Sequence, residues 1–212
     1  MPRSLSPPRP RVPIVFGVTG LPAAGKSAVA AEFRGLGAEV ADADRLVGEA
    51  LDRPRIARGV IRILGPAVRG PGGRLDRAAA AARAFGPDPA PLRRLEAIVH
   101  PIVRRGLRDA VAGARRRRAP AVVLDVPLLF ERGVDRMCDF TVFVRAARTV
   151  RLARARRRGW TAAELRRRES HQMPAAERRR RADFTVDGGG TRKAMRDQVR
   201  ALWRRTVGDR RA

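Results

Sequence analysis

Eight consecutive residues near the start of the chain, GLPAAGKS at positions 20–27, have the types and spacing of a loop that binds phosphate. They match the pattern G-x-x-x-x-G-K-[ST]. In such a loop, backbone N–H groups point at the phosphates and the following helix adds the positive end of its dipole. Lys26 would reach the β- and γ-phosphates of ATP, and the Ser27 hydroxyl would be a ligand of Mg²⁺.

The loop therefore predicts a nucleoside triphosphate site built largely from backbone. Pro22 has no N–H group, so that position cannot donate to a phosphate. The residues expected to contact ATP here are Gly20, Leu21, Pro22, Ala23, Ala24, Gly25, Lys26, Ser27 and Ala28. Such a loop is shared by switch GTPases, motors and small-molecule kinases, so other residues must separate these classes.

Acidic residues supply that information. Asp42 and Asp44 follow a short predicted strand, at the rim where open α/β sheets bind ligands. A carboxylate there can accept the proton of an attacking hydroxyl, although either aspartate can instead cap the next helix. Asp125 ends another predicted strand and can hold a water molecule on Mg²⁺. Glu131 faces the substrate or is an ordinary charged surface residue.

The sequence predicts that the elements carrying these residues form a parallel sheet connected by helices. Short apolar, β-branched runs predict buried strands at 14–19, 38–41, 121–124, 140–144 and 184–186. A helix follows the loop, and a final helix covers about 191–207. Strand, helix and strand in succession form the βαβ unit of a parallel sheet.

The middle of the chain is predicted to be helical. One apolar stripe recurs every three or four residues, at Leu92, Leu95, Val99, Val103, Leu107 and Val111. Pro101 lies within it and is expected to kink the helix or split it in two.

An arginine-rich segment, 145–181, carries 14 arginines against three glutamates. Gly159 is expected to stop its first helix, a capping box at Thr161 to start the second, and Pro174 to end that one. This helical hairpin is best interpreted as a lid. Arg151, Arg154 and Arg158 share one helix face and can converge on the polyphosphate, since guanidinium groups suit phosphate oxygens.

The overall composition limits the classes of partner and compartment but does not indicate a function. The formal charge of +26 suggests a nucleic-acid partner, but 45 of the 47 basic residues are arginine, which indicates compositional drift and solvated arginines. One cysteine, Cys138, fits a reducing cytoplasm. No run is long enough to cross a membrane, and the Pro- and Arg-rich residues 1–12 are expected to be a disordered tail.

Seven stretches together resemble the dephospho-CoA kinase family. In order they are GVTGLPAAGKS, VADADRLVGEAL, GRLDRAAAAARAF, LRRLEAIVHPIV, VVLDVPLLFERG, RLARARRRGWTAAELRRRESHQM and RADFTVDGGGT. The resemblance implies ATP-dependent phosphorylation of the ribose 3′-hydroxyl of dephospho-CoA, with Mg²⁺. It also implies a three-layer α/β/α P-loop kinase core with a helical acceptor-binding region and a helical lid.

The resemblance also implies boundaries and roles. A single domain over 13–212 would have its core at about 13–55, 119–146 and 182–208, its acceptor-binding region at about 56–118 and its lid at about 147–181. Asp44 would be the catalytic base, acting with Lys26 and Arg154. Arg154 and Arg158 would bind ATP. Acceptor contacts would come from Asp42, Asp44, Arg77 and His100. Glu131, six residues after Asp125, is added to them because of its place in the sequence.

The sequence departs from the family pattern at a few positions. Leu21 and Ala23 replace usual glycines, Ala28 a usual threonine, Arg151 a usual glutamine and Gly188 a usual asparagine. The rival interpretations are another P-loop kinase, acting on a nucleoside or nucleotide, and a basic nucleic-acid-binding protein. We expect a cytoplasmic enzyme, a monomer or weak homo-oligomer, with no membrane and no dedicated nucleic-acid partner.

Overall fold

The computed structural model describes residues 13–86, 88 and 90–208. The tail expected at 1–12 lies outside the described residues. The chain divides into two compact units, one made of the residues up to Asp42 together with those from Ala110 onward, and the other of Ala43–Asp109.

The first unit contains a five-stranded sheet in which every pairing between described strands is parallel. Its strands are β1 (Ile14–Gly20), β2 (Glu39–Asp42), β3 (Ala121–Asp125), β4 (Phe140–Arg145) and β5 (Phe184–Asp187), in the order β2-β3-β1-β4-β5. The predicted α/β P-loop fold is thus confirmed. After β1 the chain forms β2 and β3, which lie on one side of β1 in the sheet, and it then forms β4 and β5 on the other side. The loop after β1 therefore lies where the strand order reverses, the usual ligand site of such sheets.

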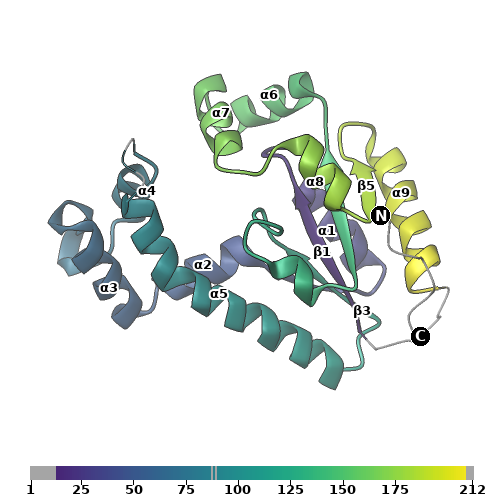
Figure 1. The fold of residues 1–212 in the computed structure, drawn as a ribbon, viewed down its shortest axis with the longest axis horizontal. Coiled ribbons are helices and arrows are strands. Elements are labelled where there is room, and N and C mark those ends of the chain that lie inside the picture. Colours follow the sequence, from purple (N-terminus) through teal and green to yellow (C-terminus); the bar gives the residue numbers. More distant parts are fainter. Residues whose placement is uncertain (1–12, 87, 89, 209–212) are drawn as a thin grey trace. The chain divides into compact units, whose positions relative to one another are not determined.

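Two helices, α1 (Lys26–Gly35) and α9 (Arg192–Thr206), cover one face of the sheet (Figure 1). Aromatic rings join the layers: the Phe16 and Phe33 centroids are 4.9 Å apart, and those of Phe33 and Trp203 are 6.4 Å apart. Phe16 and Phe33 are fully buried. Burying such side chains stabilises the fold by about 1.5–3 kcal/mol each, so this layer fixes α1 and the loop before it.

On the opposite face, the chain after β3 packs closely on β1. A Cβ atom added to Gly17 would lie 2.7 Å from the Cys138 sulfur and 2.9 Å from Leu129. Only glycine fits this approach. The short 3₁₀ helix η3 (Val134–Met137) belongs to the same covering segment.

Three helices, not two, connect β4 to β5: α6 (Arg148–Arg157), α7 (Ala162–Ser170) and α8 (Ala175–Arg181). The predicted hairpin is therefore wrong in its second half. Pro174 does not end α7, which stops at Ser170; it is the N-cap of α8, and its carbonyl accepts the N–H of Arg178. A proline suits this place because the first helical N–H groups have no intrahelical acceptor.

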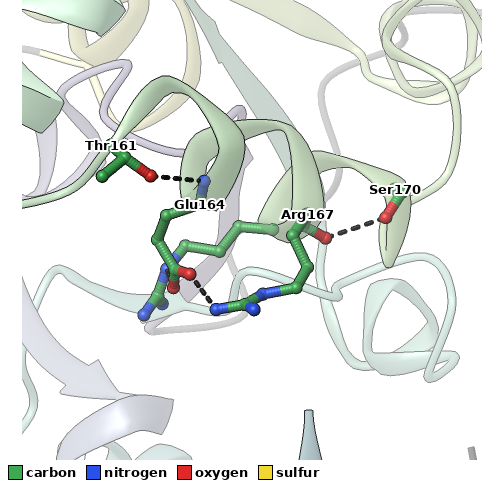
Figure 2. Close-up of polar contacts among 5 residues, drawn as sticks. Thr161, Glu164, Arg167 and Ser170 are labelled. Carbon is green, nitrogen blue, oxygen red and sulfur yellow. Dashed lines mark hydrogen bonds and ion pairs between the residues drawn. The ribbon is translucent and has the colours of Figure 1, made fainter. Parts of the chain in front are cut away.

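The predicted cap of α7 is confirmed on its Thr161 side (Figure 2). The Thr161 hydroxyl accepts the Glu164 N–H at 3.1 Å. The Glu164 carboxylate forms ion pairs with Arg167 and, at 2.9 Å, with Arg168. Near the other end, Ser170 donates its hydroxyl to the Arg167 carbonyl at 2.8 Å. The helix is thus stabilised by local contacts at both ends.

The second unit is helical. It contains α2 (Ala43–Leu51), α3 (Pro54–Leu64), α4 (Arg77–Ala84), the short 3₁₀ helices η1 (Pro66–Val68) and η2 (Pro71–Gly73), and most of α5 (Ala90–Arg116). Its core consists of Val60, Ile61, Leu64, Val68 and Ala80. The helix α5 runs through Pro101 as one element, so the predicted split does not occur. Packing of α2 on α5 is close, since a Cβ at Gly106 would lie 2.9 Å from Leu46.

Candidate active site

The loop between β1 and α1 has the backbone of a phosphate loop. Gly25 adopts φ 108° immediately before α1 begins at Lys26. Ala23 takes the left-handed conformation at φ 61°, which costs an L-residue about 1–2 kcal/mol. Leu21 is not among the described residues with positive φ. Of the two departures from glycine in this loop, only Ala23 therefore requires a torsion that glycine would adopt more readily.

The start of α1 fits an anion. Its N-cap is Gly25, no described side chain caps it, and its first turn holds no acidic residue. The first N–H groups of a helix need an acceptor from outside the helix, and the dipole favours a negative one. Gly20 is also held tightly, since an added Cβ would lie 2.4 Å from the Val144 carbonyl oxygen. These features fit a bound triphosphate.

Arg154 of α6 contacts this loop directly. Its guanidinium donates from Nη1 to the Ala24 carbonyl at 2.9 Å and from Nη2 to the Gly188 carbonyl at 2.7 Å. The side chain thereby joins α6, the phosphate loop and the turn after β5. Of the three arginines expected to converge here, this one contacts the loop.

Gly188 is a position at which the sequence indicated only a departure from the family pattern, and the structure shows a steric need for glycine. A Cβ there would lie 2.3 Å from the Ala24 carbonyl oxygen, closer than any side chain permits. The glycine therefore allows the turn after β5 to approach the phosphate loop. The signal in the sequence is the run of glycines at 188–190.

The other two arginines expected to converge on the polyphosphate have different contacts. Arg151 is buried, donates from Nε to the Ala146 carbonyl at 3.1 Å, and forms an ion pair with Glu169 of α7. It therefore holds α6 and α7 together instead of facing a polyphosphate. The exposed Arg158 lies 5.7 Å from the Trp160 ring centroid.

Carboxylates gather at the carboxyl edge of the sheet. Asp42 and Asp125 end neighbouring strands and are paired in register. Asp125 is only 6% exposed. Glu131 accepts the Met173 N–H at 2.7 Å, which attaches the segment between α7 and α8 to the core. The rim predicted from the strand ends is thus formed by Asp42 and Asp125.

Three of the five residues predicted to contact the acceptor, Asp44, Arg77 and His100, lie in the second unit, whereas Asp42 and Glu131 lie in the first. Asp44 is in the first turn of α2. Arg77 donates to the Gly48 carbonyl at 2.8 Å and forms an ion pair with Asp52, so it holds the far end of that helix. His100 lies on α5 with its Nε2 3.9 Å from Glu96.

The described residues include no group of three His, Cys, Asp or Glu side chains that could hold a metal. Mg²⁺ at a nucleotide takes one or two protein oxygens, phosphates and water as ligands, and Ser27 and Asp125 carry oxygens of this kind. No described helix is long and apolar enough to span a membrane.

Two further aspartates have structural contacts. Asp139 accepts the Val15 N–H at 2.8 Å, and Asp183 accepts both the N–H and the hydroxyl of Thr141 at 2.8 Å. Both therefore hold the amino ends of strands, at the edge opposite the phosphate loop.

Comparison with known proteins agrees with this geometry. The family model described as dephospho-CoA kinase matches residues 14–193. A dephospho-CoA kinase of Symbiobacterium thermophilum is 42% identical over 92% of this chain and 82% of its own length. That of Deinococcus radiodurans is 40% identical over 96% of this chain and 98% of its own.

Solved structures give the same result. The crystal structure of TT1252 from Thermus thermophilus is 38% identical, with a TM-score of 0.77, covering 91% of this chain and 97% of that one. The dephospho-CoA kinase from Campylobacter jejuni, 19% identical with a TM-score of 0.59 over 92% of this chain and 98% of its own, shares the fold. The chain belongs to the dephospho-CoA kinase family.

Proposed function

We propose that the protein transfers the γ-phosphoryl group of ATP to the ribose 3′-hydroxyl of dephospho-CoA, producing coenzyme A and ADP. The observation that carries this proposal is the family match across both compact units. The uncapped start of α1 after the loop supports the donor half, because a phosphate is the partner that such a helix end binds well.

On the donor side, we propose that Lys26 contacts the β- and γ-phosphates and that residues 20–28 surround the triphosphate. Bound Mg²⁺ would neutralise charge on the phosphates, with the Ser27 hydroxyl as ligand and Asp125 holding a water molecule. Arg154 and Arg158 would offset charge on the transferring group. The Arg154 contact with the Ala24 carbonyl supports this because it brings that guanidinium to the loop.

On the acceptor side, we propose that Asp44 orients the 3′-hydroxyl and accepts its proton, with Asp42 beside it in the sequence. Arg77, His100 and Glu131 would bind the acceptor. Support for Asp42, Asp44, Arg77 and His100 comes from their match to the family pattern, and support for Glu131 comes from its place six residues after Asp125 in the sequence. Closure of the lid would exclude water and so limit ATP hydrolysis.

We further propose one kinase domain over 13–212, with core segments at about 13–55, 119–146 and 182–208. The acceptor-binding region would cover about 56–118 and the lid about 147–181. The protein would act in the cytoplasm as a monomer or weak homo-oligomer. The single cysteine of the printed sequence supports a reducing compartment.

The test is an acceptor panel. Purified protein with ATP and Mg²⁺ is assayed by coupled ADP release against dephospho-CoA, nucleosides and nucleoside monophosphates. We expect turnover with dephospho-CoA at least about 100-fold above the others, because a site that pairs an acceptor's polar groups rejects analogues lacking them. Turnover with a nucleoside instead would overturn the proposal. Polynucleotide binding that is strongly salt-dependent and survives Lys26→Ala, without kinase activity, would favour the nucleic-acid alternative.

A further inference from the structure

Arg178 of α8 is a fully buried cation, at 0% exposure. The three arginines that follow it on α8 are all exposed. A long charged side chain is rarely buried unless its charge has a specific partner or task.

The buried guanidinium contacts several segments. From Nη2 it donates to the Pro127 carbonyl at 2.6 Å and to the Thr19 hydroxyl, and Thr19 itself donates to Pro127 at 3.0 Å. From Nη1 it donates to the Gln172 side chain at 2.7 Å. Its other face lies 5.7 Å from the Phe143 ring centroid. One side chain thus joins β1, the chain after β3, β4 and the segment between α7 and α8.

These contacts adjoin the donor site. Thr19, which is 0% exposed, immediately precedes Gly20 of the phosphate loop. Pro127 follows Asp125 by two residues, and Val18 and Asp125 are partners in the sheet. Beside Gln172, the Met173 N–H is held by Glu131. The segment between α7 and α8, residues 171–174, is the return segment of the proposed lid. It is therefore attached to the ends of β1, which leads into the phosphate loop, and of β3, which ends at Asp125.

Stability alone explains this arrangement poorly. Burial lowers the pKa of Arg178, an effect opposed by the Glu131 charge. The Arg178 Nε has no hydrogen-bond partner among the described residues. Apolar side chains of similar volume often replace buried charges with no loss of stability. A costly buried cation with this planar, multi-branched geometry is better suited to fixing the positions of several groups at once.

We propose that Arg178 is a positioning residue for phosphoryl transfer, which holds the lid's return segment against the ends of β1 and β3. The inference rests on the proposed kinase function. The hydrogen bond from its Nη1 to Gln172 connects it to the proposed lid. The hydrogen bonds from its Nη2 to Thr19 and Pro127 connect it to the strands beside the phosphate loop.

The test compares four proteins: wild type, Arg178→Met, Gln172→Leu and the matched control Arg180→Met, which removes an exposed charge from the same helix. We measure kcat, KM for ATP and melting temperature. We expect kcat at saturating ATP to fall about tenfold or more in Arg178→Met and Gln172→Leu, since displacement by 1 Å can cost about 100-fold. Gln172→Leu should keep a melting temperature near wild type, and Arg180→Met should match wild type throughout.

The Gln172 variant decides the question even if Arg178→Met fails to fold, because a merely structural role predicts wild-type kcat in folded Gln172→Leu. Wild-type kcat in that variant would overturn the proposal. If Arg178→Met folds, combining both changes should add little to it, because both remove one connection; fully additive losses would contradict the shared role. Absence of wild-type turnover with dephospho-CoA would instead refute the proposed function, and so the two failures are distinguishable.

Discussion

Replacing Gly188 by alanine should damage both stability and ATP use. The added Cβ would lie 2.3 Å from the Ala24 carbonyl oxygen, whereas ordinary contact begins at 3.4 Å. The loop or the turn after β5 must then move by about 1 Å, since both atoms belong to backbone or are attached directly to it. Gly188 does not have positive φ, so the effect is steric and not torsional.

The movement displaces both carbonyls that Arg154 contacts at 2.9 and 2.7 Å. Overpacking of this kind costs about 1–3 kcal/mol. At about 2–4 °C per kcal/mol for a chain of this size, the melting temperature should fall by about 2–12 °C. Misplacement of the loop by 1 Å should lower kcat/KM for ATP by about 10- to 100-fold.

The assay is calorimetry together with steady-state kinetics at varied ATP. Gly190→Ala is the matched control, because its added Cβ meets only Ala194 at 3.9 Å and should leave both quantities near wild type. Wild-type stability and kinetics in Gly188→Ala would refute the close approach. Equal damage in Gly190→Ala would show that flexibility of the glycine run, and not contact with Ala24, is what matters.

Two substitutions and one labelling experiment test separate parts of the account. Asp44→Asn should lower kcat by about 10²- to 10⁴-fold with ATP affinity retained, as expected for a general base; unchanged kcat would remove Asp44 from that role. Lys26→Ala should impair ATP use with every acceptor, measured by ADP release, and normal ATP use would exclude the loop. Burial raises the pKa of the Cys138 thiol to about 12, from an ordinary 9.0. Folding therefore becomes less favourable as pH rises from about 9 toward 12, because the native state resists loss of the thiol proton. At pH 9 a thiol reagent should label the partly buried Cys138 more slowly in native than in unfolded protein, and equal rates would contradict this effect.

Local signals in the sequence were sufficient for the sheet and the loop. Short β-branched runs predicted each strand to within about one or two residues, because buried parallel strands are continuously apolar. The phosphate loop was identifiable because its motif lies between a strand and a helix. Thr161 was recognised as a cap since both the residue type and the following glutamate are local features.

Features that depend on tertiary contacts were not predictable. The sequence favours a helix end at Pro174, although a proline at a helix start has the same local signature. Arg151 and Arg178 are buried, but nothing in an arginine-rich segment distinguishes them from their solvated neighbours. The need for glycine at position 188 arises from Ala24, which is far away in the sequence.

The central claim is transfer to one hydroxyl of one acceptor, and identification of the product tests it most directly. Protein, Mg²⁺, dephospho-CoA and ATP labelled at the γ-phosphate are incubated, and the products are separated and analysed by phosphorus NMR. We expect the label in a compound that co-elutes with coenzyme A and carries a ribose 3′-monophosphate, with ADP formed in equal amount. Label found only in inorganic phosphate, or on another position or acceptor, would contradict the account.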